Sequence, residues 1–181
     1  MSTRKKSAKV VKAMRSPSVT VRDRRNRKGS EHEIELDKYV EDALEDAFGE
    51  DVDLRKLSLV ITDADHLDDE AVKALSSDGG VDAEDLIALG ELMDEHSDAD
   101  LVAAALVAAD GDVDYAGTLC ENVAWVGGRN EDEEDYAYYV VEEGLMGDNL
   151  GNYFDYEAFG RDLMHDVHPV KVGRQIVVFN N

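Results

Sequence analysis

The chain has 181 residues, enough for one large domain or for two or three small ones. Its 42 acids and 19 bases give a formal net charge of −23, while a hydrophobic fraction of 43% still allows a packed core. The longest apolar run, LVAAALVAA, is too short to span a bilayer, and no apolar segment follows the basic N-terminus as in a secretory signal.

The chain contains one cysteine, Cys120, which cannot form a disulfide within the chain. Nothing in the cysteine content therefore points to an oxidising compartment. Together with the lack of a membrane or secretion signal, this predicts a soluble cytoplasmic protein.

The charges are unevenly placed along the chain. Residues 1–30, the basic head, contain eleven Lys or Arg and one acid. Residues 31–181, the acidic body, contain 41 acids and 8 bases, a net charge of −33. Such an asymmetry is typical of a polyanionic unit carrying a basic arm.

The first 66 residues predict a tail and a small sheet. Residues 1–16 are poor in apolar residues and are expected to be a disordered basic tail. SVTV and HEIEL alternate apolar and polar residues around the basic turn RRNRKG, which predicts a β-hairpin. LSLVI at 57–61 predicts a third strand, so residues 17–66 are expected to form a sheet with one helix.

That helix is predicted to begin at Asp37 as its N-cap and to end at Gly49. Helical spacing assigns its apolar face to Tyr39, Val40, Ala43, Leu44, Ala47 and Phe48.

Residues 67–109 predict a helical domain. A short helix is expected around Ala71, Val72 and Leu75. Asp82 and Asp98 are expected to cap two longer helices. The first of these should bury Leu86, Ile87, Leu89 and Met93, and the second should stop before Gly111.

Residues 110–181 predict a mixed α+β C-terminal domain. A helix through Tyr115 and Leu119 is followed by a strand in NVAWV and by a helix that Asn130 should cap. VHPVKVGRQIVVF then predicts a closing hairpin that turns at Gly173. The fold class expected for the chain is α+β in three small parts.

The acids form the candidate functional set. Many lie one helical turn apart, where side chains are about 5–6 Å from one another, close to the spacing of phosphates along a DNA strand. A net charge of −33 equals that of about 55 Å of duplex. We therefore predict a partner-binding set of phosphate-mimicking carboxylates: Glu84, Asp85, Glu91, Asp94, Glu95, Glu131, Asp132, Glu133, Glu134, Asp135, Glu142, Glu143, Asp155 and Glu157.

The residues alone leave other interpretations open. The acids can equally form a solvated face or an adaptation to high salt. Asp110, Asp112, Asp114 and Glu121 stand at positions 1, 3, 5 and 12 of an EF-hand loop, although Tyr115 replaces the glycine of its sharp turn. His165, Asp166 and His168 offer zinc ligands without cysteine support.

We predict no enzyme, no cofactor and no bound metal, and the two metal interpretations above are the weaker alternatives. No glycine-rich loop follows a strand as in a phosphate-binding site, and no serine or cysteine has a base at a recognisable spacing.

One aromatic segment, NYFDYEAFGRDL at 152–163, stands out in this acidic region. Asp155 is expected to cap a helix that buries one face, with Gly160 allowing close packing. Arg161 is expected to form an ion pair that ties the terminal domain together. The structural landmark residues of the segment are Tyr153, Tyr156, Phe159, Gly160 and Arg161.

This segment closely resembles the landmark near the C-terminus of the ArdA antirestriction family. The preceding EEDYAYYVVEEGLMGD resembles the acidic helix that leads into the landmark. LVITDADH resembles the end of the family's first domain, and VTV, NRKG and IELD resemble its opening hairpin. The resemblance runs from about Ser18 to Phe179 and leaves the basic tail outside it.

The resemblance implies a non-enzymatic, elongated, three-domain DNA mimic encoded by a mobile element. It also implies a homodimer formed through the C-terminal domain, which we expect near Trp125, Val126 and the 167–179 hairpin. The implied partner is a Type I restriction-modification enzyme, whose DNA-binding groove such proteins occupy.

The alternative is an acidic partner or regulator of nucleoid-type DNA-binding proteins. Direct contact with nucleic acid is expected only if the basic tail makes it. Residues 1–16 and the 22–28 turn are instead expected to fold back loosely on the acidic body, because tethering raises the local concentration of carboxylates.

Overall fold

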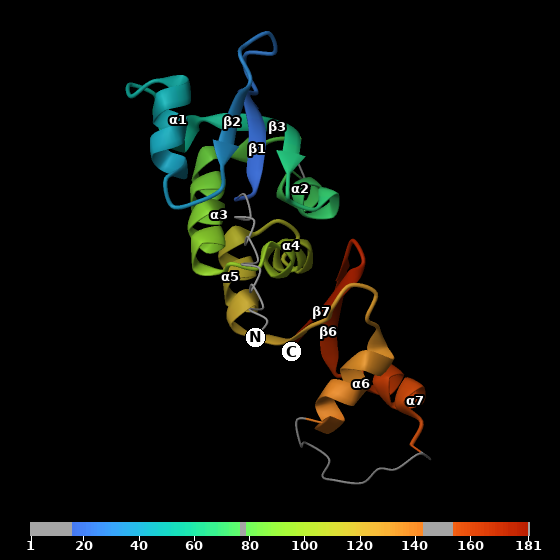
Figure 1. Ribbon diagram of the computed structural model, residues 1–181. Helices are drawn as coiled ribbons and strands as arrows, with labels where there is room; N and C mark the ends of the chain where they lie inside the picture. The colour runs from blue at the N-terminus through green and yellow to red at the C-terminus, as the bar shows by residue number, and fades with distance from the viewer. Residues whose placement is uncertain (1–15, 77–78, 143–153, 181) are drawn as a thin grey trace, which may run out of the picture.

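The computed structural model describes residues 16–76, 79–142 and 154–180. Figure 1 shows an elongated arrangement, with a β-sheet at one end and a pair of helices at the other. The described residues form seven α-helices and two antiparallel sheets, which confirms the α+β class. Of the predicted tail only Ser16 falls within the described residues.

The first sheet has the strand order β2-β1-β3-β4, and every neighbouring pair in it is antiparallel. The predicted hairpin is confirmed, because Val19 stands opposite Ile34 and both side chains are buried. The fourth strand was not predicted. The four strands are β1 (Ser18–Asp23), β2 (His32–Glu35), β3 (Ser58–Asp65) and β4 (Val81–Asp82).

Helix α1 (Val40–Phe48) ends at Gly49, as predicted, with φ at 104°. The prediction that Tyr39 joins its buried face is wrong, because the helix begins only at Val40. The Asp37 carboxylate accepts the Tyr39 N–H at 2.8 Å and forms a turn before the helix instead of capping it.

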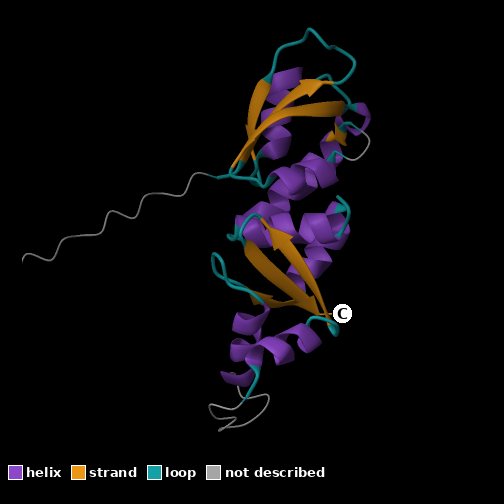
Figure 2. Ribbon diagram, turned by 90° about the vertical axis from the view of Figure 1, so that its right-hand side faces the viewer, coloured by secondary structure: helices purple, strands orange, loops and turns teal. Residues whose placement is uncertain are grey.

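Four more helices follow α1 along the chain, and Figure 2 shows helices lying between the two sheets. Asp68, Asp98 and Asp112 each accept a backbone N–H and cap α2, α4 and α5. Asp82 stands at the predicted N-cap of α3, but its side chain makes no cap hydrogen bond. The helices are α2 (Asp69–Leu75), α3 (Ala83–Glu95), α4 (Ala99–Ala108) and α5 (Val113–Glu121), preceded by a 3-10 turn at Leu54–Lys56.

Helix α4 is the buried centre of the molecule. Every residue from Leu101 to Leu106 is buried, and α2, α5 and β6 all pack on this helix. The turn after it approaches α2 closely: a Cβ on Gly111, at φ +86°, would stand 2.3 Å from the Ala74 carbonyl oxygen. Glycine at this position therefore allows the α4–α5 turn to pack against α2.

The C-terminal sheet has the order β5-β7-β6, and its two faces pack on different elements. Val177 and Phe179 of β7 join the main core, whereas Val178 packs with α6 and α7. This is the alternation expected of a strand covered on both sides. The elements are β5 (Val123–Val126), α6 (Glu133–Glu142), α7 (Tyr156–Leu163), β6 (Val167–Val172) and β7 (Gln175–Asn180).

Two predictions for the C-terminal part can be compared with the structure. The hairpin does turn at Gly173, where φ is +56°. Asn130 does not cap α6, because it adopts a φ of +68° in the preceding turn. Asp132, next to the helix, accepts the Glu134 N–H at 3.0 Å and takes that role. The division into three domains stays a prediction, and the main core runs from Val19 to Phe179.

The landmark segment packs α7 against α6. Phe159 and Leu163 join the small core beneath the two helices, and Tyr156 stacks on Tyr138 with ring centroids 3.9 Å apart. A Cβ on Gly160 would stand 2.1 Å from the Glu133 carbonyl oxygen, so glycine lets the two helices touch. Tyr153 lies outside the described residues.

We predict that Gly160→Ala destabilises the protein by about 2 kcal/mol, because α7 must move away from α6 to accept the methyl group. Thermal unfolding followed by circular dichroism measures the effect. The control is Ala158→Gly on the same helix, which changes helix propensity without adding a clash. An unchanged melting temperature for Gly160→Ala would contradict the observed packing.

Candidate acidic interaction surface

The predicted carboxylates lie on the surface, in two separate groups. One group follows α3 (Glu84, Asp85, Glu91, Asp94 and Glu95), and all five residues are exposed. The other lies around α6 and α7 at the far end of the molecule (Figure 1), where Glu133 and Asp135 are half-buried. Glu143 lies outside the described residues, as does the side chain of Glu142.

The α3 group borders a groove between α1 and α3 with a volume of about 480 Å³. Glu41 and Glu45 line it from α1, and Glu84 and Glu91 line it from α3. Each pair follows helical spacing, i to i+4 and i to i+7, so carboxylates run along both walls. Arg55 is the one base lining this groove, and it pairs with Glu84 at 3.7 Å, with both side chains well exposed.

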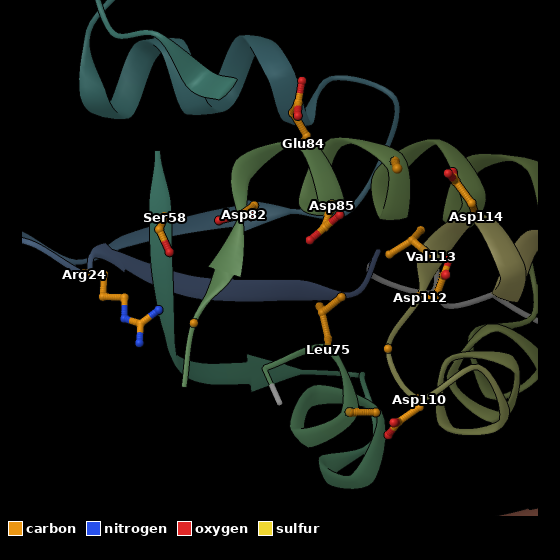
Figure 3. A pocket seen from close by; sticks show the side chains of 14 residues that line it. Arg24, Ser58, Leu75, Asp82, Glu84, Asp85, Asp110, Asp112, Val113 and Asp114 are labelled. Carbon is orange, nitrogen blue, oxygen red and sulfur yellow. The ribbon is translucent and has the colours of Figure 1, made fainter. Parts of the chain in front are cut away.

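A second hollow, the acidic cleft, opens beside the start of α3 and has a volume of about 730 Å³ (Figure 3). Six carboxylates line it: Asp82, Glu84, Asp85, Asp110, Asp112 and Asp114. Because Glu84 and Ala88 line both hollows, the groove and the cleft form one continuous surface around α3. We call this the α3 acidic surface.

Arg24 of the basic head also lines the cleft, at its edge in Figure 3. Its backbone N–H donates to the Ser58 carbonyl oxygen at 3.0 Å, which fixes this end of the basic turn beside the sheet. The turn thus places one base at the edge of the acidic cleft, and the fold-back expected for the whole 22–28 turn stays a prediction. The same expectation for residues 1–16 concerns residues outside the described part.

The acidic cleft changes the pKa of Asp85, one of the carboxylates that line it. Burial raises the pKa of Asp85, and the nearby charge of Asp82 raises it further, followed by Glu84 and Asp112. Although Asp85 is exposed as a residue, its carboxylate points into the cleft, where the walls exclude part of the water (Figure 3). The pKa of Asp100 on α4 is also raised, first by burial and then by Asp98 and Asp68.

We predict that Asp85→Asn raises the melting temperature at pH 7 by about 1–3 °C. A pKa raised above its ordinary value of 3.8 means that the folded state loses stability as pH rises through the folded pKa. Removing the charge removes this cost at pH 7, and the gain should vanish below about pH 3.8.

Glu95→Gln is the matched control, because it loses one exposed charge on the same helix outside the cleft. Thermal unfolding of both variants at pH 7 and pH 3 measures the difference. Equal melting temperatures for the two variants at pH 7 would show that only the total charge matters.

Neither metal interpretation is supported by a cluster of ligands among the described residues. Within residues 16–76, 79–142 and 154–180, no three or more His, Cys, Asp or Glu side chains gather closely enough to hold a metal ion. In the EF-hand-like segment, the Asp112 carboxylate instead accepts the Tyr115 N–H at 2.9 Å and caps α5.

The carboxylates around α6 and α7 also hold the local backbone. Asp135 accepts the Asp132 N–H at 2.9 Å, Asp155 accepts the Ala158 N–H at 2.9 Å, and Glu131 accepts the Gly128 N–H. Amide substitutions here therefore change helix caps as well as charge.

Arg161 forms an ion pair with Glu157 one turn earlier on α7, at 3.2 Å, its one ion pair within the described part of the chain. Both partners are exposed and lie on one helix, so this pair does not link α7 to another element, and the tie across the terminal domain stays a prediction.

A family model described as antirestriction protein (ArdA) matches residues 31–175. The chain belongs to the ArdA antirestriction family. The match covers most of the span that resembles the family in sequence, and residues 1–30 lie outside it. No curated protein and no solved structure gives a match to this chain.

Membership in the ArdA family implies an antirestriction function, with a restriction enzyme as the partner in general. No helix in the described parts of this ArdA protein has the length and apolar character needed to cross a membrane.

The structure adds carboxylates that the sequence analysis of this ArdA protein missed. Glu41 and Glu45 face Glu84 and Glu91 across the groove, and their i to i+4 spacing was a visible signal. The carboxylates of the α4–α5 turn were considered only as calcium ligands. No sequence signal places them beside α3, because Gly111 and the packing of α2 bring them there.

Proposed function

We propose that this ArdA protein blocks restriction as a non-enzymatic DNA mimic that occupies the DNA-binding groove of a Type I restriction-modification enzyme. The supporting observation is the α3 acidic surface, where carboxylates line both walls of a groove and continue into the acidic cleft. Only two bases, Arg24 and Arg55, are among the residues lining these two hollows.

Mimicry of this kind requires carboxylates with the right charge at the right positions, and it involves no chemical reaction. A DNA-binding groove presents Lys and Arg side chains that normally contact phosphates. Carboxylates repeated along helices offer acceptors at comparable intervals, and rigid helices hold them in place before binding. The partner therefore loses access to DNA by competition.

The proposal is tested by adding the purified protein to a Type I enzyme with unmodified target DNA. We expect cleavage to stop near stoichiometric amounts and to resume when excess DNA is added. Type II cleavage of the same DNA is the control for sequestration of cofactors. Unaffected Type I cleavage together with binding to histone-like proteins would favour a regulator of nucleoid-type proteins instead.

The proposed assembly is a homodimer through the C-terminal part, as the family resemblance implied. In the region expected from sequence, Val170, Val172 and the 177–179 segment are buried within the protomer, while the other residues are half-buried or exposed. The accessible part includes a groove of about 490 Å³ lined by Met164, Pro169 and Ile176, of which the last two belong to this hairpin.

We predict that light scattering at micromolar concentration gives twice the protomer mass of 20.0 kDa. Because like-charged protomers repel, the contact must be apolar, and Ile176→Glu should give monomers. Glu95→Gln, on α3, is the control and should leave the mass of the dimer unchanged. A monomer in the wild type would exclude this assembly.

A further inference from the structure

All four large hydrophobic side chains that are exposed among the described residues are tyrosines. Tyr39 is 58% exposed, Tyr115 51%, Tyr138 41% and Tyr139 38%. Tyrosine has an apolar ring that costs free energy to expose, and it is enriched at binding hot spots. No leucine, isoleucine or phenylalanine is similarly exposed in these ranges, so the exposure is specific to one side chain type.

Three of these tyrosines follow a carboxylate by one helical turn. Asp112, the N-cap of α5, precedes Tyr115 by three positions, and its carboxylate accepts the Tyr115 backbone N–H at 2.9 Å. Glu134 and Asp135 precede Tyr138 and Tyr139 on α6 by four positions each. Side chains at these spacings are neighbours, about 5–6 Å apart at Cβ. Each of the three tyrosines thus follows an acid at a spacing that makes neighbours, and the Asp112 and Asp135 carboxylates also accept backbone N–H groups.

A guanidinium group matches this combination of ring and carboxylate. Its planar face stacks on an aromatic ring, while its N–H groups donate to a carboxylate at the edge. An ammonium group can bind the carboxylate but cannot stack in the same way. At the fourth tyrosine, next to α1, the Lys38 Nζ lies 5.4 Å from the centre of the neighbouring Tyr39 ring and also pairs with Asp94.

We propose that Tyr115, Tyr138 and Tyr139 are stacking sites for arginine side chains of the partner's DNA-binding groove. The inference rests on the proposed function and adds a short-range contact to the long-range attraction by the acids. DNA carries no such exposed phenol rings beside its phosphates. These three contacts would therefore select arginine over lysine, where charge alone distinguishes them poorly.

The three positions differ in how free their rings are. Tyr138 stacks on Tyr156 with centroids 3.9 Å apart, which leaves one ring face for a partner. Tyr139 has wider contacts, with the Trp125 and Tyr136 centroids each 6.4 Å away. Tyr115 makes no aromatic contact among the described residues, so its substitution disturbs no ring packing there.

The test measures calorimetric binding of hexa-arginine and hexa-lysine peptides to the full chain. We expect the wild type to bind hexa-arginine about tenfold more tightly. Replacing the three tyrosines by leucine should remove this preference while hexa-lysine binding stays the same, because no charge changes. Replacing them by phenylalanine keeps the rings and should keep the preference.

Two controls separate stacking from folding. Tyr115→Leu alone should reduce the preference by about twofold to threefold without disturbing α6 or its contacts. Tyr39→Leu is a matched exposed tyrosine whose ring already faces Lys38, and it should have no effect. Equal affinity of the wild type for both peptides, or a full arginine preference in the leucine variants, would overturn the inference.

The same variants then show whether stacking contributes to inhibition. We expect the triple leucine variant to inhibit a Type I enzyme about tenfold to a hundredfold less well, and the phenylalanine variant to match the wild type. If the wild type does not inhibit the enzyme, the proposed function is wrong. The peptide experiment still shows whether the three tyrosines bind arginine side chains. Unchanged mass in light scattering excludes loss of a dimer as the cause.

Discussion

Replacing Glu41, Glu45, Glu84, Glu91 and Glu95 together by glutamine is expected to weaken inhibition by about two to three orders of magnitude. Each carboxylate should contribute about 0.5–1 kcal/mol when it meets a base of the partner, and about 1.4 kcal/mol corresponds to tenfold in affinity. A single glutamine substitution should therefore change inhibition by only about twofold to fivefold. Titration of a Type I cleavage assay measures both.

These five positions, four in the groove and Glu95 beyond it on α3, allow charge to be removed without loss of structure. None of them accepts a capping hydrogen bond in the helices, unlike Asp135 and Asp155 at the other end of the molecule. The ion pair of Glu84 with Arg55 is exposed and contributes little to stability. Glutamine is nearly as good a helix former as glutamate, so circular dichroism should be unchanged.

The matched control removes five other exposed acids, Glu35, Glu50, Asp51, Asp69 and Glu70, which line neither hollow. The two variants have the same net charge, so a focused surface predicts a much smaller loss for the control. Equal losses would show that total charge, and not the α3 acidic surface, produces inhibition. Complete loss from one folded glutamine variant would contradict a contact spread over many carboxylates.

Binding to the restriction enzyme is expected to weaken by about a hundredfold between 50 and 200 mM salt. The enzyme's basic groove releases bound anions when it meets carboxylates, and salt screens attractions beyond about 10 Å. A contact made mainly of apolar groups would show little change. The dependence therefore reports how much of the affinity is electrostatic.

Calorimetry without DNA measures this dependence directly, since DNA binding to the enzyme has its own salt dependence. The five-glutamine variant should give a shallower slope than the wild type, because fewer charges are paired. The triple leucine variant of the tyrosines should keep the wild-type slope. A flat affinity over this range would argue against charge mimicry.

Much of the fold could be predicted from local patterns. The hairpin of β1 and β2, the end of α1 at Gly49 and the caps Asp98 and Asp155 all agree with the structure. These features depend on neighbours within a few positions, where side-chain alternation and capping act directly. The predictions failed where a turn shifted a helix start, as at Asn130 and Tyr39.

The two-residue strand β4 was missed for a different reason. Its pairing of Val81 with Leu59 depends on a partner 22 positions away in the chain. So short an element carries no periodic signal of its own. The landmark segment was predicted better, because Phe159 and Leu163 follow helical spacing and Gly160 marks a close approach.

The sequence by itself determined the chemistry of this protein: a net charge of −33 on residues 31–181, with acids repeated at helical intervals. Charge and spacing are properties of the chain, so they survive any arrangement of the helices. Only the tertiary structure decided which acids meet. Packing of α1 on α3 places Glu41 and Glu45 across a groove from Glu84 and Glu91, and the turn at Gly111 adds the acids of the cleft. The acids come close together because apolar contacts join segments that are distant in the chain. No local pattern of acids in the sequence predicts those contacts.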